Sequence, residues 1–322
     1  MTSPKGSTRV VHVALIGNLL VAATKLVAAL WTGSSAMMSE TVHSFVDCSN
    51  EVLLLYGLRR ASRAADVHHP LGYGRELYFW SFIVALLIFA IGAGVSTYDG
   101  IIHIRSPRAI SDPTVNYVVL GLALVFESVS WIISMRQFRS AKGSLGYYEA
   151  FRQSKDPTSF MVLFEDSAAI VGIVIAALGT VGSVQLHDPR LDGVASVLIG
   201  VVLAGVSFLL TKESKSLLIG ERADRQLSES ILRIAGAERR IGRANGVLTM
   251  QLAPDQIVAA LSLDFEDALS AAEVEAAVAD IERRVQAAHP HVVALFVKPQ
   301  AHGSFRQRGA VGFEEPRAPD PG

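Results

Sequence analysis

The chain has 322 residues, of which 50% are hydrophobic and only 18% are charged, and its formal net charge is −1. About a quarter of the residues of a water-soluble domain are usually charged, so this composition, with a mean hydropathy of +0.37, excludes an ordinary soluble protein and indicates an integral membrane protein. The charge is near zero and no basic cluster contains interleaved aromatic residues, so we expect no nucleic-acid partner.

Six apolar segments of membrane-spanning length follow one another along the chain: residues 10–31, 37–58, 77–103, 114–135, 159–182 and 192–212. Each is close to the ~20 residues that a helix needs to cross the hydrocarbon of a bilayer. The lipid bilayer is therefore a predicted partner. We expect residues 1–9 to form a short cytoplasmic tail and residues 10–212 to form a transmembrane domain of six helices.

The distribution of Lys and Arg predicts the orientation. With six spans, both termini and the loops near 59–76 and 136–158 lie on one face, which holds thirteen of these residues, whereas the other face holds only Arg105, Arg108 and Arg190. Positive residues concentrate on the cytoplasmic side, so both termini are expected there, with the cell membrane as the location. Lys25 lies near the outer end of the first span, where its amine is expected to reach the interface.

Residues 213–299 have the mixed composition of a second domain, with a predicted α-β-β-α-β order. "RQLSESILRIAG" suits an amphipathic helix, and "GVLTMQLAPDQIVAALSLDFE" suits two strands around an Ala-Pro-Asp-Gln turn. Ser270 and Glu273 have the spacing of a capping box, which predicts a helix to about Ala288, and "VVALFV" supplies a third strand. The order predicts a small α+β domain with helices on one face of a sheet. Residues 300–322 are predicted to be disordered.

The second span carries a polar stripe, "ETVHSFVDCSNE", over residues 40–51. On a helix, Glu40, His43, Asp47, Asn50 and Glu51 fall within an arc of about 100°. His43 and Asp47 lie one turn apart at its centre. A charge near the bilayer centre costs ~2.5–3.5 kcal/mol, so such side chains need a partner or an aqueous cavity. An imidazole and a carboxylate at this spacing can bind one divalent cation, and they suit an interhelical hydrogen-bond cluster equally well.

The fifth span contains a second acidic site, formed by Glu165 and Asp166 beside a ridge of small residues, Ala168, Gly172, Ala176 and Gly179. Such a ridge allows a neighbouring helix to approach closely. These carboxylates could therefore close around one ion together with His43 and Asp47. Carboxylates with one imidazole suit Zn²⁺, Mn²⁺, Fe²⁺ or Co²⁺. A further pair, Asp99 and His103, lies at the outer end of the third span, where packing is favoured over a metal site.

Four motifs, in this order and spacing, resemble those of the cation diffusion facilitator family: "SETVHSFVD", "HPLGYGRELYFWSF", "EDSAAIVG" and "DPRLDGVASVLIG". The resemblance covers about residues 10–299 and is strongest to the branch that includes zinc transporter nine. It implies a metal/proton antiporter with six transmembrane helices and a cytoplasmic ferredoxin-like domain that forms a homodimer. It implies divalent metal and protons as the transported partners, with Zn²⁺ first, and neither enzymatic activity nor a resident cofactor.

The resemblance implies a transport site made of His43, Asp47 and Asp166. The family's fourth ligand position is Val162 here, and Glu165 is the first candidate to replace it, with Asn50, Glu127 or a water as alternatives. Some relatives hold an accessory metal in the loop of Asp66 and His69, where a solvated loop is the preferred interpretation here. Lys298 would repel a cation at the position of another accessory site, so the C-terminal domain is expected to act as a dimerisation module.

The implied mechanism is alternating access, in which protons and metal compete for the same ligands. His43 is the best-placed group for this competition because imidazole titrates near neutral pH. A membrane-embedded metal sensor or scaffold without transport is the alternative that the valine at position 162 favours.

Overall fold

The computed structural model describes residues 4–143, 145–307 and 312–316. The chain divides into two compact units. One consists of the chain up to Arg59 together with Leu77–Lys215, and the other of Arg60–Glu76 together with the chain from Ser216.

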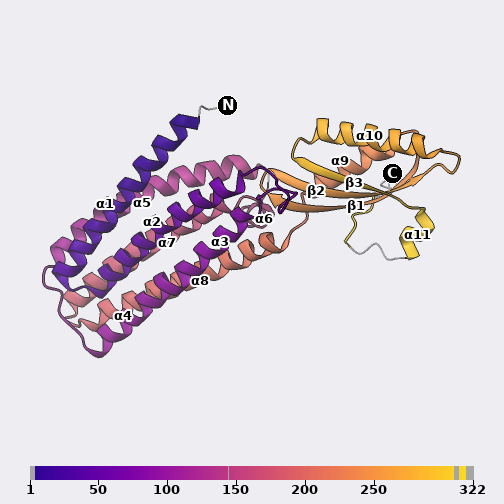
Figure 1. The fold of residues 1–322 in the computed structure, drawn as a ribbon. Coiled ribbons are helices and arrows are strands. Elements are labelled where there is room, and N and C mark those ends of the chain that lie inside the picture. The colour runs from indigo at the N-terminus through magenta and orange to yellow at the C-terminus, as the bar shows by residue number, and fades with distance from the viewer. Residues whose placement is uncertain (1–3, 144, 308–311, 317–322) are drawn as a thin grey trace. The chain divides into compact units, whose positions relative to one another are not determined.

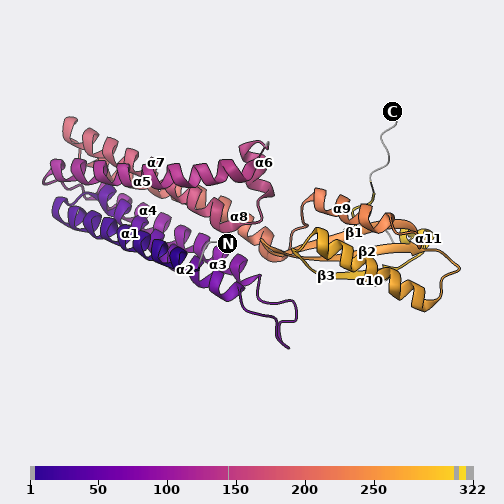
Figure 2. The same ribbon diagram turned by 90° about the horizontal axis from the view of Figure 1, so that it is seen from above.

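The first unit is a bundle of long helices that run side by side (Figures 1 and 2). Its helices are α1 (Pro4–Thr32), α2 (Ser35–Ala61), α3 (Glu76–Leu87), α4 (Gly94–Arg105), α5 (Pro113–Lys142), α7 (Pro157–Gln185) and α8 (Arg190–Ile219). A π-helical segment, η1 (Ile88–Ala93), joins α3 and α4 into one span. The six predicted spans therefore fall, in order, within helices of the bundle, which confirms the predicted fold class.

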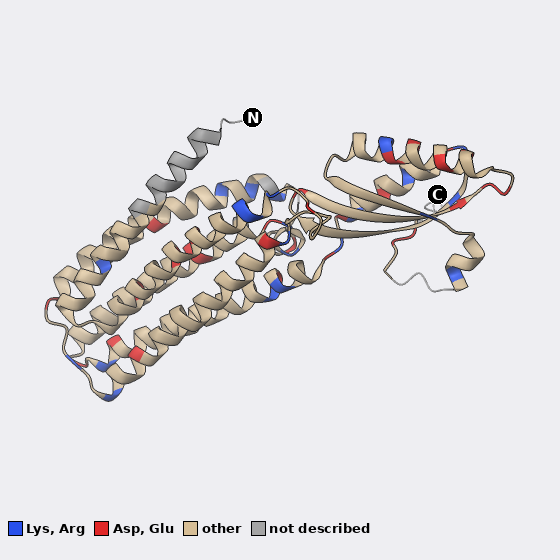
Figure 3. Ribbon diagram, viewed as in Figure 1, with Lys and Arg blue, Asp and Glu red and all other residues tan. Residues whose placement is uncertain are grey.

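Charged residues are sparse along the middle of these helices (Figure 3). By length and apolar composition, four of the described helical segments can cross a membrane, namely Glu76–Arg105, Pro113–Ser140, Phe160–Gln185 and Arg190–Ile219. Asn18–Thr32 is a shorter apolar segment. Residues 1–9 were expected to form a tail before the first helix, but α1 already begins at Pro4. Residues 1–3 lie outside the described residues.

The starts of α5 and α7 show how the sequence ends the preceding loops. Each helix begins at the proline of an Asp-Pro pair. The carboxylates of Asp112 and Asp156 accept hydrogen bonds from the backbone N–H groups of Thr114 and Thr158 at 3.1 and 3.0 Å. An N-cap carboxylate satisfies a free N–H of the first turn, and proline suits the first helical position because it has no N–H to lose. A short helix, α6 (Tyr147–Gln153), lies in the loop between α5 and α7 and was not predicted.

Glycines bring two pairs of helices into close contact. A Cβ on Gly100 of α4 would lie 2.7 Å from the carbonyl oxygen of Gly193 on α8, so these backbones touch where a larger residue would not fit. On the predicted ridge of α7, a Cβ on Gly172 would collide with the carboxylate of Glu40 on α2. Small residues permit this approach, as expected between helices in a bilayer.

The second unit contains the predicted α-β-β-α-β order: α9 (Arg225–Gly236), β1 (Ile241–Ala253), β2 (Gln256–Phe265), α10 (Ala271–Ala288) and β3 (Val292–Pro299). The sheet order is β1-β2-β3, with β1 and β2 antiparallel and β2 and β3 parallel. Ile231 of α9 and Ile281 of α10 share one buried core with Val247, Leu261 and Leu295 of the strands, so both helices cover one face (Figure 2). The predicted capping box of Ser270 and Glu273 is present.

The predicted disordered tail, residues 300–322, needs a correction in its described part. Helix α11 (His302–Gln307) buries Phe305, and the backbone N–H of His302 donates to the Asp264 carboxylate at 2.9 Å. Glu314 pairs with Val247 through two backbone hydrogen bonds. Composition alone suggested disorder because these partners lie in two strands, β2 and β1, that are distant in the sequence. Residues 308–311 and 317–322 lie outside the described residues.

Candidate metal-binding site

A polar cavity of about 50 Å³ lies inside the bundle among α1, α2, α5 and α7. Such a volume suits one ion with a small number of waters. Five carboxylates line it, those of Asp47, Glu51, Glu127, Glu165 and Asp166. The remaining lining residues are Asn18, Val21, Ser44, Leu54, Ser130 and Val162. A concentration of carboxylates within an apolar bundle is costly unless cations or protons accompany it, so the cavity is a candidate cation site.

His43 and Asp47 lie one turn apart on α2, with His43 Nε2 3.5 Å from Asp47 Oδ2. The imidazole is only 2% exposed. Within the described part of the chain, neither ring nitrogen of His43 nor Oδ1 of Asp47 has a hydrogen-bond partner. A buried polar atom without a partner is unfavourable, and an ion placed beside these atoms would supply the missing interaction.

Asp166 of α7 is held from the neighbouring helix. Its Oδ2 accepts hydrogen bonds from the hydroxyl groups of Ser130 and Ser134 on α5, both at 3.0 Å. These serines lie one turn apart, and together they fix the orientation of the carboxylate. Hydrogen bonds of this kind orient the ligands of metal sites. The two serines were not predicted from the sequence, although their four-residue spacing on the fourth span was a usable signal.

Glu165 and Asn50 were rival candidates for the fourth ligand, and the structure joins them. Asn50 Nδ2 donates to Glu165 Oε1 at 2.9 Å, and the Glu165 side chain is buried. Glu127, the other protein candidate, faces the same cavity, as does Val162. Glu51 was not predicted to belong to the site, and it accepts a hydrogen bond from Asn18 at 2.5 Å.

The structure thus brings Asp47, Glu165 and Asp166 to one cavity and places His43 against Asp47. It does not arrange them as a closed ligand shell: among the residues that the structure describes, no three His, Cys, Asp or Glu side chains form a group that could hold a metal ion. The predicted residues therefore share a cavity, while a coordination sphere would require their side chains to move closer together.

Lys25 corrects a prediction about the first span. Its side chain does not reach the interface but is fully buried, with Nζ 3.1 Å from Glu40 Oε2 and 2.8 Å from Ser44 Oγ on α2. The interface prediction was wrong because it treated α1 in isolation. A lysine within an apolar span, followed by a glutamate in the polar stripe of the next span, was the signal for pairing.

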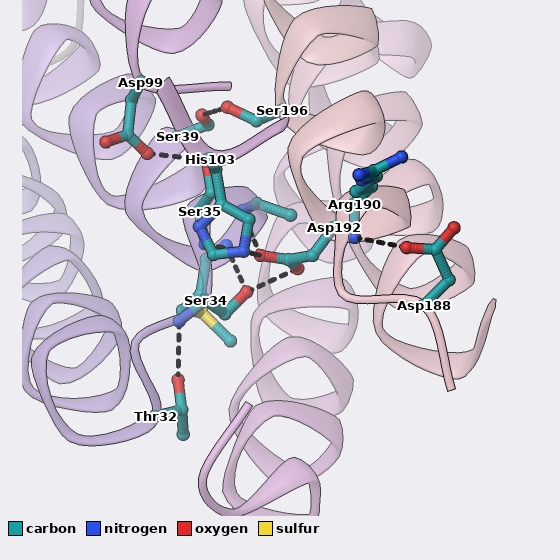
Figure 4. Close-up of polar contacts among 12 residues, drawn as sticks. Thr32, Ser34, Ser35, Ser39, Asp99, His103, Asp188, Arg190, Asp192 and Ser196 are labelled. Atoms are coloured by element: carbon teal, nitrogen blue, oxygen red, sulfur yellow. Dashed lines mark hydrogen bonds and ion pairs between the residues drawn. The ribbon is translucent and has the colours of Figure 1, made fainter. Parts of the chain in front are cut away.

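The outer pair Asp99 and His103 belongs to a cluster at the start of α2 (Figure 4). Asp192 of α8 accepts hydrogen bonds from Ser34 Oγ at 2.7 Å and from the backbone N–H groups of Ser35 and Ala36 at 2.5 and 3.3 Å. Asp99 Oδ2 accepts from Ser35 Oγ at 2.6 Å, and His103 Nε2 lies 3.9 Å from Asp192 Oδ2. A carboxylate from one helix caps the start of another, which supports the packing interpretation.

Asp66 lies in the loop before α3, and both of its carboxylate oxygens accept hydrogen bonds from other residues of that loop. Its Oδ1 accepts from the backbone N–H groups of His68 and His69, and its Oδ2 accepts from the Tyr73 hydroxyl at 2.6 Å. The hydrogen bond from Tyr73, followed by that from the His69 N–H, lowers the pKa of Asp66. Because these bonds already occupy both oxygens, the solvated-loop interpretation is favoured over an accessory metal site.

Apolar helices around a buried cavity lined by carboxylates, followed by a small α+β unit, define a multi-pass membrane protein. The comparison with known families is specific: residues 11–219 match the cation efflux transmembrane domain. The chain belongs to the cation efflux family.

Three relatives show the similarity in more detail. The chain is 37% identical over 220 residues to the proton-coupled zinc antiporter SLC30A9, mitochondrial, of Xenopus laevis, covering 67% of this chain and 39% of the relative. It is 33% identical to metal tolerance protein C4 of Arabidopsis thaliana, covering 70% and 50%. It is also 33% identical to the human SLC30A9 protein, covering 67% and 38%. The chain therefore spans about two fifths to half of the length of these relatives, and they support the predicted branch of the family.

Proposed function

We propose that the protein exports a divalent transition-metal cation in exchange for protons, with Zn²⁺ as the first substrate and Mn²⁺, Fe²⁺ and Co²⁺ as further candidates. The observation that carries the proposal is the meeting of Asp47 from α2 and Asp166 from α7 at one cavity, with His43 beside Asp47. Imidazole and carboxylate together suit these metals. Relatives named as proton-coupled zinc antiporters support the same substrate.

Proton coupling follows from the chemistry of the ligands. A metal binds neutral imidazole and ionised carboxylate, so its binding releases protons and protonation releases the metal. In alternating access the cavity opens first to the cytoplasm, where His43, Asp47, Asp166 and Glu165 take the metal, and then to the outside, where protons displace it. The excess of Lys and Arg on one face supports cytoplasmic termini. The cell membrane remains the predicted location, and the C-terminal domain the predicted contact of a homodimer.

Reconstitution into proteoliposomes tests this function. We expect saturable Zn²⁺ or Mn²⁺ uptake that an opposing proton gradient stimulates and that Asp47→Asn or Asp166→Asn abolishes. Ca²⁺ and Mg²⁺ should compete poorly, because they prefer more oxygen ligands or retained waters. Glu149→Gln, on α6 outside the spans, is the control and should transport normally. A rate that does not change when an ionophore collapses the proton gradient would contradict antiport.

A metal sensor without transport is the second candidate. Val162 at the usual ligand position and the open arrangement of the four predicted ligands favour it. The same vesicles separate the two candidates. A sensor binds zinc at equilibrium, as titration calorimetry would show, but moves no zinc across the bilayer under any imposed gradient.

A further inference from the structure

The buried pair of Lys25 and Glu40 lies beside the candidate metal site but has no part in the proposed ligand set. Both side chains have no exposed surface. Lys25 is the only lysine or arginine that is buried among the residues whose side chains the structure describes. A lone ammonium in the apolar bundle is therefore a specific feature of the membrane unit and needs an explanation.

Two contacts connect this pair to the metal site. Lys25 Nζ donates to Ser44 Oγ at 2.8 Å, and Ser44 lines the same cavity as Asp47 and Asp166. Glu40 uses Oε2 for Lys25, while its buried Oε1 has no hydrogen-bond partner in the described structure. The pair thus joins α1 to α2, the helix that carries His43 and Asp47, and its cationic end is the one that reaches the cavity wall.

Stability does not account for such a pair. Removing two charges from water costs more than their attraction commonly returns, and apolar replacements of buried ion pairs are often neutral or stabilising. Charges in an apolar interior do, however, act over long distances, because little solvent screens them. A fixed ammonium at the wall of a carboxylate-lined cavity must therefore weaken the attraction between that cavity and a divalent cation.

We propose that Lys25 is a positioning residue that sets the affinity of the transport site, with Glu40 as the counter-ion that holds it in place. The inference rests on the proposed function. A transporter has to bind its ion strongly enough to load and weakly enough to release it, and the same balance applies to ions in channels. Lys25 offsets part of the charge of the five carboxylates, so the cation is not trapped.

Single substitutions in the pair should shift zinc affinity in opposite directions. Lys25→Met leaves the negative charge of Glu40, so zinc should bind about tenfold more tightly, while the maximal transport rate falls because release is slower. Glu40→Gln leaves the ammonium unbalanced, so zinc should bind about tenfold more weakly. A purely structural pair would weaken binding in both variants.

The experiment measures equilibrium zinc binding to the full-length protein in detergent, together with KM and maximal rate in vesicles. Lys25→Arg keeps the charge and should stay within about twofold of the wild type. If a single variant does not fold, the doubly neutral Lys25→Met/Glu40→Gln variant replaces it, since it contains no unpaired charge. Because Lys25 is the partner at the cavity wall, this variant should bind zinc a few-fold more tightly than the wild type.

Two results would overturn the inference: weaker binding in both single variants, or binding in the double variant equal to that of the wild type. A wild-type protein that neither binds nor moves Zn²⁺, Mn²⁺ or Co²⁺ would instead overturn the proposed function, and the inference with it. The wild-type measurement therefore separates the two failures.

Discussion

Glu165 has both a hydrogen bond from Asn50 and a place in the cavity, and its two roles predict different results for one substitution. As a ligand, Glu165 contributes a bond and a charge in a poorly screened site, so Glu165→Gln should weaken zinc binding by several kcal/mol, nearly as much as Asp47→Asn. If Glu165 only accepts a hydrogen bond, the effect of Glu165→Gln should be small, because glutamine keeps an acceptor oxygen. Its size should then be near the ~0.6 kcal/mol of an average hydrogen bond between membrane helices.

We expect the larger effect, measured by zinc titration of the purified protein. Glu51→Gln is the matched control, since Glu51 lines the same cavity but is not a proposed ligand. Equal, small effects in Glu165→Gln and Glu51→Gln would remove Glu165 from the ligand set.

Val162 offers the complementary test, because it already faces the cavity of Asp47 and Asp166. Val162→His would place an imidazole at the family's usual ligand position. Imidazole favours Zn²⁺ over Mn²⁺, so we expect tighter zinc binding and a lower ratio of manganese to zinc transport in competition uptake. Val162→Leu, an apolar change at the same position, should not shift this ratio. A histidine variant with unchanged selectivity would show that position 162 does not reach the bound ion.

Contacts between side chains were most predictable from the sequence where both residues lie on the same helix. The four-residue spacing predicted that His43 and Asp47 lie together, and the structure places them 3.5 Å apart. It failed for Lys25 and did not identify Ser130 or Ser134, because their partners lie on other helices. Periodicity gives the direction of a side chain around its own helix, but not which neighbour it meets.

At the scale of elements, the start of α2 depends on one carboxylate of α8. Asp192→Ala removes the acceptor of three hydrogen bonds and leaves buried donors without partners, at a cost of about 1–3 kcal/mol. We expect a lower midpoint of thermal unfolding in detergent, with Asp192→Asn intermediate because its amide oxygen still accepts. Asp188→Ala is the control, since Asp188 makes a comparable but exposed bond to the Arg190 N–H. Equal midpoints for the two alanine variants would contradict this role.

The capping box of α10 predicts a pH dependence. Hydrogen bonds from the Ser270 N–H and hydroxyl lower the pKa of Glu273. A carboxyl whose pKa is lower in the folded state contributes stability above its unfolded pKa of about 4.3, and this contribution is lost as pH falls through the folded pKa. Glu273→Gln should therefore flatten the acid limb of the unfolding free energy of the C-terminal domain. Glu275→Gln, an exposed change on the same helix, is the control, and its unfolding free energy should fall more steeply at acid pH than that of Glu273→Gln. An identical fall in both variants would show that the cap does not cause this pH dependence.

The long elements were predictable because each carries its own repeated pattern. Apolar length predicted the six spans, and the α-β-β-α-β order followed from periodicity and the Ser270 cap. The π-helical turn at Ile88–Ala93, the short α6 and the tail helix α11 were not predicted. A π-helical turn leaves apolar composition unchanged, and α11 contacts a sheet whose nearest residues are distant in sequence.

At the scale of the whole molecule, we predict that the C-terminal domain alone forms a dimer. Phe296 is 59% exposed on β3, and an aromatic side chain in water on a sheet favours association. Residues 213–316, which retain the pairing of Glu314 with Val247, should be soluble and dimeric in analytical ultracentrifugation, and Phe296→Ser should shift the fragment toward monomer. They should bind zinc weakly. Tight stoichiometric zinc binding, or a monomer at every concentration, would contradict the assignment as a dimerisation module.

Asp192 also has a consequence for biosynthesis. Its partner Ser35 lies 157 residues earlier in the chain. Ribosomes add about 5–20 residues per second, so Ser35 is made on the order of ten to thirty seconds before Asp192. During that interval the first backbone N–H groups of α2 have to rely on water or lipid head groups. Loss of Asp192 would leave the start of α2 uncapped after the chain is complete, so it should appear first as rapid degradation of the newly made chain, before any change in the zinc uptake measured in vesicles.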